Sequence, residues 1–320
     1  FEWESAGFKA IRPGDTLARL WKAKHGDTKG LAAHLDGVYA AAVEDLAKST
    51  EVTLPESVSR SVLCELFTSV RADAAVAAEM STAALTRRLG TDKLIVIRYH
   101  PLDVASRNVA SRNQTNGDPL ANDASLNRLA YYRGRTIPSV YLDGRRLAGT
   151  DGLLADTTRV HRQLVRQTIK RLAQPTDWSL TLAAKRTGSS IQVTASAKSE
   201  TPASGEYRLR MLLVEERIPM PEARCGIRVQ EMVVRWQIDG GDGAVPKDGK
   251  FAVTETVSIV DIRKRLTEDL ARFERLQGMN FPEKPLEMKS LFVIALVQDE
   301  TTREVLQAKL VPVTSVPASN

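Results

Sequence analysis

Histidines are the first side chains to consider for catalysis or metal binding, because imidazole titrates near neutral pH and binds transition metals. The chain has four: His25, His34, His100 and His161. No two of them have metal-ligand spacing. His100 ends an apolar run beside a long polar stretch, where it could act as a general base with Asp103 or Asp118. The alternative is a loop histidine that hydrogen-bonds the backbone.

Two cysteines, Cys64 and Cys225, are too few for a zinc site or a disulfide framework. Cys64 lies inside a predicted strand, where we expect a small, buried apolar side chain. Cys225 follows in a loop in the other half of the chain. We expect free thiols, with a Cys64–Cys225 disulfide as the alternative. No phosphate-binding loop or metal motif accompanies them, so the sequence predicts no metal and no cofactor.

Arginines gather around one long polar stretch, residues 101–122, and the hairpin that follows it. They are Arg107, Arg112, Arg133, Arg135, Arg145 and Arg146. They could form a basic rim for an acidic partner or an anion; the alternative is a set of solvated side chains. The stretch repeats Val-Ala-Ser-Arg-Asn in tandem at 104–113. Loops of this length inside compact domains are often functional, so this loop and the rim are the predicted partner surface.

The composition bounds the classes of function. The 320 residues carry a net charge of +6, and aromatic residues make up only 5%. A modest charge and few aromatic rings argue against nucleic-acid binding. No apolar run approaches the roughly 20 residues that a membrane helix needs. The length suits two domains rather than one.

Apolar spacing divides the chain into parts. Residues 1–57 predict a helical N-terminal arm and linker, since apolar positions recur every three or four residues. Residues 58–174 predict strand 62–67, helix 73–89, strand 93–99, helix 123–132, a hairpin entered through Pro138 with an Asp-Gly turn, and helix 153–172. Residues 175–314 alternate in hydrophobicity and predict a β-sandwich with one inserted helix at 261–276. Residues 315–320 predict a flexible tail.

Short motifs in this order are similar to those of a secreted, planctomycete-type thioredoxin-like family. The matching segments are Glu65-Leu66-Phe67-Thr68, Val76-Ala77-Ala78-Glu79, Arg98-Tyr99-His100, Asp118-Pro119-Leu120-Ala121-Asn122 and Thr136-Ile137-Pro138. Residues 212–216, 232–235, 289–291, 297–299 and 305–308 resemble its C-terminal β-domain. The resemblance implies a cis bond before Pro138. It also places the two Cys-x-x-Cys positions on Ala72 and Ala75, so both sulfurs are absent.

The lost sulfurs change the predicted function. Thiol–disulfide exchange needs an attacking thiolate and a resolving sulfur, and alanine supplies neither. We therefore expect a redox-inactive, degenerate thioredoxin-like domain followed by a β-sandwich. Its expected role is that of a non-catalytic binding, scaffolding or assembly subunit with protein partners. The resemblance alone implies export to the periplasm or beyond the cell. The alternative is an enzyme with non-thiol chemistry centred on His100.

Overall fold

The computed structural model describes residues 13–101, 117–201, 205–221, 223–278, 280–281 and 284–315. Contacts divide the chain into two compact units, residues 1–42 and 43–320. The four ranges expected from the sequence are thus grouped differently, since residues of the expected thioredoxin-like and β-sandwich domains share one unit.

The first unit contains α1 (Pro13–His25) and most of α2 (Leu31–Lys48), the two helices expected in the arm. Trp21 packs across the turn between these two helices. Its ring stacks on His25 with 4.1 Å between centroids and lies 4.9 Å from His34. The indole Nε1 donates a hydrogen bond of 3.2 Å to the carbonyl of Lys29 in the turn. Aromatic packing across the turn therefore fixes this helical pair.

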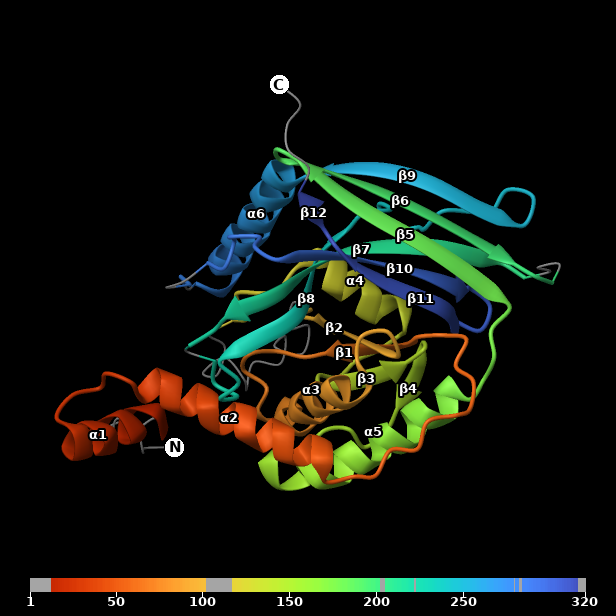
Figure 1. Cartoon of the computed structure of the whole chain (residues 1–320). Helices are drawn as coiled ribbons and strands as arrows, with labels where there is room; N and C mark the ends of the chain where they lie inside the picture. The colour runs from red at the N-terminus through yellow and green to blue at the C-terminus, as the bar shows by residue number, and fades with distance from the viewer. Residues whose placement is uncertain are drawn as a thin grey trace. The chain divides into compact units, whose positions relative to one another are not determined.

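The second unit is built on an eight-stranded sheet with the order β11-β10-β7-β8-β2-β1-β3-β4. Its first half supplies β1 (Val62–Phe67), α3 (Val76–Leu89), β2 (Leu94–Tyr99), α4 (Asp123–Tyr131), β3 (Ser139–Leu142), β4 (Arg145–Leu147) and α5 (Thr157–Leu172). β1 and β2 pair in parallel, and β3 pairs antiparallel with β1 and β4. This is the element order that the sequence predicts. Helices α3 and α5 lie side by side against β1, β2 and β3 (Figure 1).

The second half supplies β7 (Tyr207–Pro219), β8 (Val229–Gln237), β10 (Leu291–Asp299) and β11 (Val305–Pro312) to the same sheet. The junction is a parallel pairing between β2 and β8, at Arg98 and Val233. The expectation of a β-sandwich apart from the first domain therefore misses a continuous sheet. The local pattern of apolar residues indicates that a strand is buried, but it does not determine which strand pairs with it.

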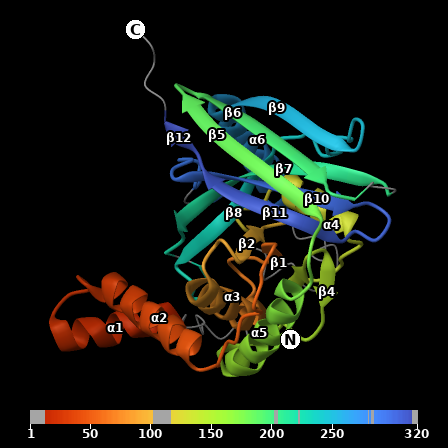
Figure 2. The same cartoon turned by 45° about the vertical axis from the view of Figure 1, so that its right-hand side comes forward.

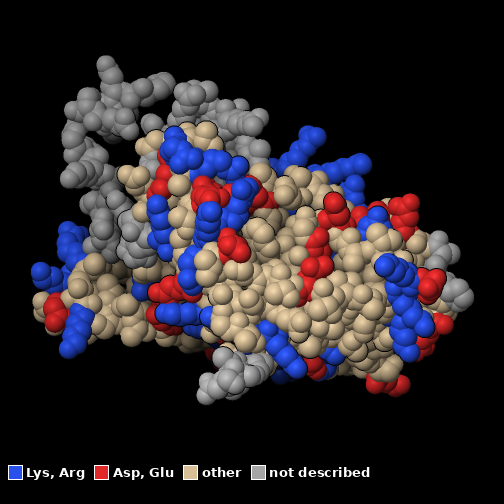
Figure 3. Space-filling model, turned by 90° about the horizontal axis from the view of Figure 1, so that it is seen from above, with Lys and Arg blue, Asp and Glu red and all other residues tan. Residues whose placement is uncertain are grey.

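A second, four-stranded sheet has the order β12-β5-β6-β9, formed by β5 (Trp178–Thr187), β6 (Ser190–Ser199), β9 (Lys250–Ser258) and β12 (Thr314–Ser315). Figures 1 and 2 show β5, β6 and β9 as a layer over β7, β10 and β11. Its outer face carries small polar residues such as Thr181, Thr194 and Ser196, and Figure 3 shows a broad uncharged area there.

Among the described residues, three large apolar cores hold these layers together. One lies between the two sheets and includes Ile191, Val193 and Met211, covered at one end by α6 (Ile259–Gln277). A second lies between the large sheet and α3 and α5. The third joins residues of β1 and β2, such as Phe67, to Val214 of β7 and Ile294 of β10. The third core explains why the two halves of the chain form one compact unit.

Candidate functional site

The loop after β1 carries Ala72 and Ala75, the two positions at which the resemblance would put redox cysteines. Ala72 caps a short 3-10 turn that runs into α3, and its carbonyl accepts a hydrogen bond of 2.9 Å from the N–H of Ala75. Ala72 is partly exposed, whereas Ala75 is fully buried. A thiolate at the first position would be stabilised by the positive end of the helix. Methyl groups there have no charge to stabilise and no sulfur to exchange.

Two neighbouring segments hold this loop in place. The N–H of Gly152 donates to the carbonyl of Ala74 at 2.7 Å, and the N–H of Ala77 donates to the carbonyl of Gly152 at 3.1 Å. The Ile137–Pro138 peptide bond is cis, as the resemblance implies. Pro138 precedes Ser139, which pairs with Phe67, the last residue of β1. The expected positions Ala72, Ala75 and Pro138 therefore belong to the same end of the sheet.

The connection between β7 and β8 packs against this loop, which the sequence does not reveal. The N–H of Cys225 donates to the carbonyl of Val70 at 3.1 Å. Arg224 and Asp73 form an ion pair of 3.6 Å. Val70 also packs in a small core with Ile218 and Met220. The chain thus occupies part of its own loop surface with a segment from its second half.

His100 and Asp118 form the pair that the sequence offers as a possible base. Nδ1 of His100 lies 2.7 Å from Oδ2 of Asp118. The Asp118 carboxylate also accepts from the N–H groups of Val70 and Leu120. His100 is 0% exposed, and among the described residues its Nε2 has no hydrogen-bond partner. The pair therefore ties three chain segments together beneath the surface. Asp103, Arg107, Arg112 and the 104–113 repeat lie outside the described residues.

Replacing Asp118 by asparagine should remove a pH-dependent part of the stability. Burial alone would raise the pKa of Asp118, but His100 and the two N–H donors outweigh it and hold the pKa below 3.8. A lowered carboxyl pKa adds stability above the unfolded-state pKa, and this stability is lost as pH falls through the folded-state value. We expect Asp118→Asn to cost about 1–3 kcal/mol at pH 7.

Urea unfolding at a series of pH values measures this effect. The difference from the wild type should shrink as the pH falls below 3.8, the unperturbed value for an aspartate. Asp242→Asn, at an exposed carboxyl, is the matched control and should change little. A constant difference at all pH values would contradict the role assigned to the ionised Asp118.

The two cysteines are free, so the alternative of a Cys64–Cys225 disulfide is not realised. Cys64 is buried in β1 as predicted. Burial raises the pKa of both thiols from 9.0 to about 12. Neither is a ready nucleophile at neutral pH, because the thiolate is the reactive form.

Both thiols should therefore react slowly with a disulfide reagent such as dithiobis(nitrobenzoate). The raised pKa leaves about a thousandfold less thiolate at pH 8 than an unperturbed cysteine has. The folded chain should release almost no chromophore on the timescale in which the urea-unfolded chain releases two equivalents. Rapid reaction of one thiol in the folded chain would show an activated cysteine and overturn the expectation.

The arginine rim is only partly available to a partner. Arg145 forms an ion pair of 2.6 Å with Glu304, and Arg146 donates to the hydroxyl of Thr136 at 3.1 Å. Arg133 and Arg135 are exposed. Two of these four side chains thus already bind groups of the chain itself.

Sequence reasoning missed a buried network on the opposite face of the sheet from α3 and α5. The guanidinium of Arg128 donates from Nε to Oε1 of Glu65 at 2.7 Å and from Nη1 to the side-chain oxygen of Gln298 at 2.8 Å. The Tyr132 hydroxyl donates to Oε2 of Glu65 at 2.5 Å. The signal was present, because Glu65 is a charged residue inside an otherwise apolar strand.

Within the described ranges, no group of three or more His, Cys, Asp or Glu side chains could hold a metal ion. No helix among them combines the length and apolar character that crossing a bilayer requires.

Comparison with known proteins gives a likeness of fold. No family model and no curated protein matches the chain. Among solved structures it is similar to HBP35 of Porphyromonas gingivalis, with a TM-score of 0.56, 11% identity, and coverage of 83% of this chain and 79% of that one. A domain of the outer membrane lipoprotein Omp28 from the same organism gives a TM-score of only 0.28 at 19% identity, covering 45% of this chain and 99% of that domain. The likeness to HBP35 supports a mixed α/β fold with large sheets and carries no activity with it.

Proposed function

We propose that residues 58–174 are a degenerate thioredoxin-like unit and that the chain acts as a non-catalytic binding or scaffolding subunit of a protein assembly. The observation that carries this proposal is the pair Ala72 and Ala75 at the N-terminus of α3, where exchange chemistry would need sulfur. The raised pKa values of Cys64 and Cys225 support it, since neither thiol replaces the missing ones.

The packing around the loop also supports a binding role. A thioredoxin-like loop that reacts with substrates has to be open to them, whereas Cys225 and Arg224 here contact the loop from the second half of the chain. The scaffold is thereby fixed in one shape, which favours recognition by a preformed surface. The same proposal puts this assembly outside the cytoplasm, and the resemblance to a secreted family supports that part of it.

A second candidate function is an enzyme without thiol chemistry that uses His100. The 2.7 Å contact with Asp118 orients the imidazole as in a general base, and this favours the candidate. The complete burial of His100 counts against it, because a base must reach the proton that it removes. We therefore rank the binding role first.

The test is gentle purification of the chain from its source organism, with the native mass and the co-purifying chains determined. A stable complex of fixed stoichiometry is the expected result. A monomer without partners would contradict the subunit role and favour a search for ligands of the His100 pair.

A further inference from the structure

Helix α5 is the most one-sidedly charged element among those described. Its sequence, Thr157–Leu172, contains five Lys or Arg residues and no Asp or Glu. Arg171 points inward, where it binds Asp143. The other four are exposed and follow one another every three or four residues: Arg159, Arg162, Arg166 and Lys170. This spacing places them in one stripe on the solvent side of the helix.

The stripe is poorly neutralised. Arg159 lies 3.3 Å from Asp156, but among the described residues Arg162, Arg166 and Lys170 have no ion-pair partner. Helix α6 is the counterexample within the same chain. Its Arg265 and Arg272 both bind Asp123 and Asp269. A basic helix without compensating acids repels itself, and an acidic partner relieves this repulsion.

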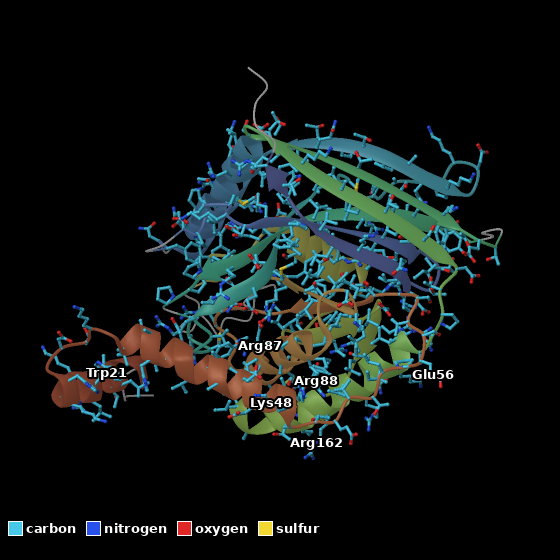
Figure 4. All side chains as sticks on the ribbon, viewed as in Figure 1. Trp21, Lys48, Glu56, Arg87, Arg88 and Arg162 are labelled. Atoms are coloured by element: carbon cyan, nitrogen blue, oxygen red, sulfur yellow. The ribbon has the colours of Figure 1, made fainter. Side chains whose placement is uncertain are left out.

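Helix α3 extends the basic surface. Ser81 contacts both Thr157 and His161, and the two helices start at the hydrogen bonds between the Ala74 loop and Gly152. They therefore run side by side in the same direction, and two turns beyond Ser81 brings Arg88 level with the middle of the stripe. Figure 4 shows Arg87, Arg88 and Arg162 on this side of the protein. Arg87 and Arg88 are both exposed.

Two exposed leucines lie next to one end of the stripe. Leu153 and Leu154, just before α5, are 58% and 65% exposed. The guanidinium of Arg159 donates to the carbonyls of Gly149 and Asp151, so it lies beside the loop that carries these leucines. Adjacent exposed leucines next to arginines are typical of a protein contact, in which an apolar anchor accompanies charged contacts.

We propose that the α3–α5 basic face, defined as Arg87, Arg88, Arg159, Arg162, Arg166 and Lys170, docks an acidic helical segment of a partner protein. The stripe on α5 is about 16 Å long, which matches three turns of a helix with carboxylates every three or four residues. Arginine forks pair with carboxylates in bidentate geometry. The inference rests on the proposed binding function and names the chemistry of the partner.

A membrane surface fits the face less well. Helices that lie in a bilayer interface place apolar side chains along the buried side. Between the basic positions of α5, the half-buried residues are Gln163, Gln167 and Ile169, and Ile169 packs against the core beneath the helix. Among the described residues of this face, the exposed large apolar side chains are Leu153 and Leu154, and both lie at one end. The observations therefore favour a carboxylate-bearing protein segment over a lipid surface.

The experiment measures binding of a fluorescent helical peptide with glutamates at three- and four-residue spacing, by anisotropy, to the full chain. A peptide with glutamines in place of the glutamates is the ligand control. Arg162→Glu/Arg166→Glu should weaken binding at least about tenfold, and physiological salt should weaken binding to the wild type as well. Lys264→Glu/Arg275→Glu on α6 makes the same change in net charge at exposed positions, and we expect binding within about twofold of the wild type.

Three results would overturn the proposal. Equal losses in both double variants would mean that only net charge matters. Undiminished binding in Arg162→Glu/Arg166→Glu would place the acidic site elsewhere. Binding to phosphatidylserine vesicles that depends on Arg162 and Arg166 and exceeds peptide binding would make the face a membrane contact. If the circular dichroism spectrum of Arg162→Glu/Arg166→Glu shows that this variant does not fold, Arg162→Gln/Arg166→Gln is used in its place. A native complex insensitive to these changes would leave the binding function intact and remove only this face from it.

Discussion

Replacing Arg128 by methionine is expected to lower the free energy of unfolding by about 3–5 kcal/mol. The Arg128 and Glu65 side chains are only 3% and 0% exposed, and the guanidinium makes two hydrogen bonds to the carboxylate. Without Arg128, the Glu65 carboxylate stays in the interior without a cation beside it, although the Tyr132 hydroxyl still donates to it. An uncompensated buried charge is among the most destabilising changes that a point substitution makes.

A double-mutant cycle separates the charge effect from lost packing. Glu65→Leu/Arg128→Met removes both charges together, so it should cost less than the sum of the two single variants. Arg217→Met is the matched control at a surface pair, since Arg217 and Glu231 are 60% and 37% exposed, and we expect a loss below about 1 kcal/mol. Urea unfolding followed by circular dichroism gives all four values. A loss below about 1 kcal/mol in Arg128→Met would contradict a buried, coupled network.

Local patterns predicted the elements of this fold well. Alternation in β6 produces inward Ile191 and Val193 and outward Gln192 and Thr194. The near-continuous apolar run of 94–97 correctly indicated a strand buried on both faces. The Asp143-Gly144 dipeptide predicted the turn between β3 and β4, where both residues have positive φ. Such signals succeed because they depend on residues close in sequence.

Long-range partners were not predictable in the same way. Arg128 lies 63 residues from Glu65, and the Val233 that pairs with Arg98 lies in another half of the chain. The sequence around one member of such a pair does not determine its partner, because the chain offers many strands and many charged side chains that could serve equally well. The His100–Asp118 pair is the exception, because both residues belong to motifs flanking one loop. The sequence shows that α5 carries several positive charges. Whether acidic side chains neutralise them depends on which segments the fold places beside the helix.

The second large effect is expected at Gly144, where the turn between β3 and β4 meets the turn between β10 and β11. Gly144 has a φ of +79°, and a Cβ there would lie 1.9 Å from the carbonyl oxygen of Arg303. The two turns also share a hydrogen bond of 3.0 Å from the N–H of Val305 to the carbonyl of Asp143. Gly144→Ala must therefore displace backbone, and we expect it to cost about 3 kcal/mol or more.

Gly188→Ala is the control that isolates the clash. Gly188 also has a positive φ, +59°, but a Cβ there would meet no atom within 4 Å. It should show only the conformational cost, about 1–2 kcal/mol. The excess in Gly144→Ala then measures how firmly the β3–β4 turn packs on the β10–β11 turn, and urea unfolding gives both values. Equal losses in the two variants would mean that the β3–β4 turn and the β10–β11 turn separate easily. A larger loss at Gly144 would mean that the two turns are packed tightly, because a methyl group in one turn then displaces the backbone of the other.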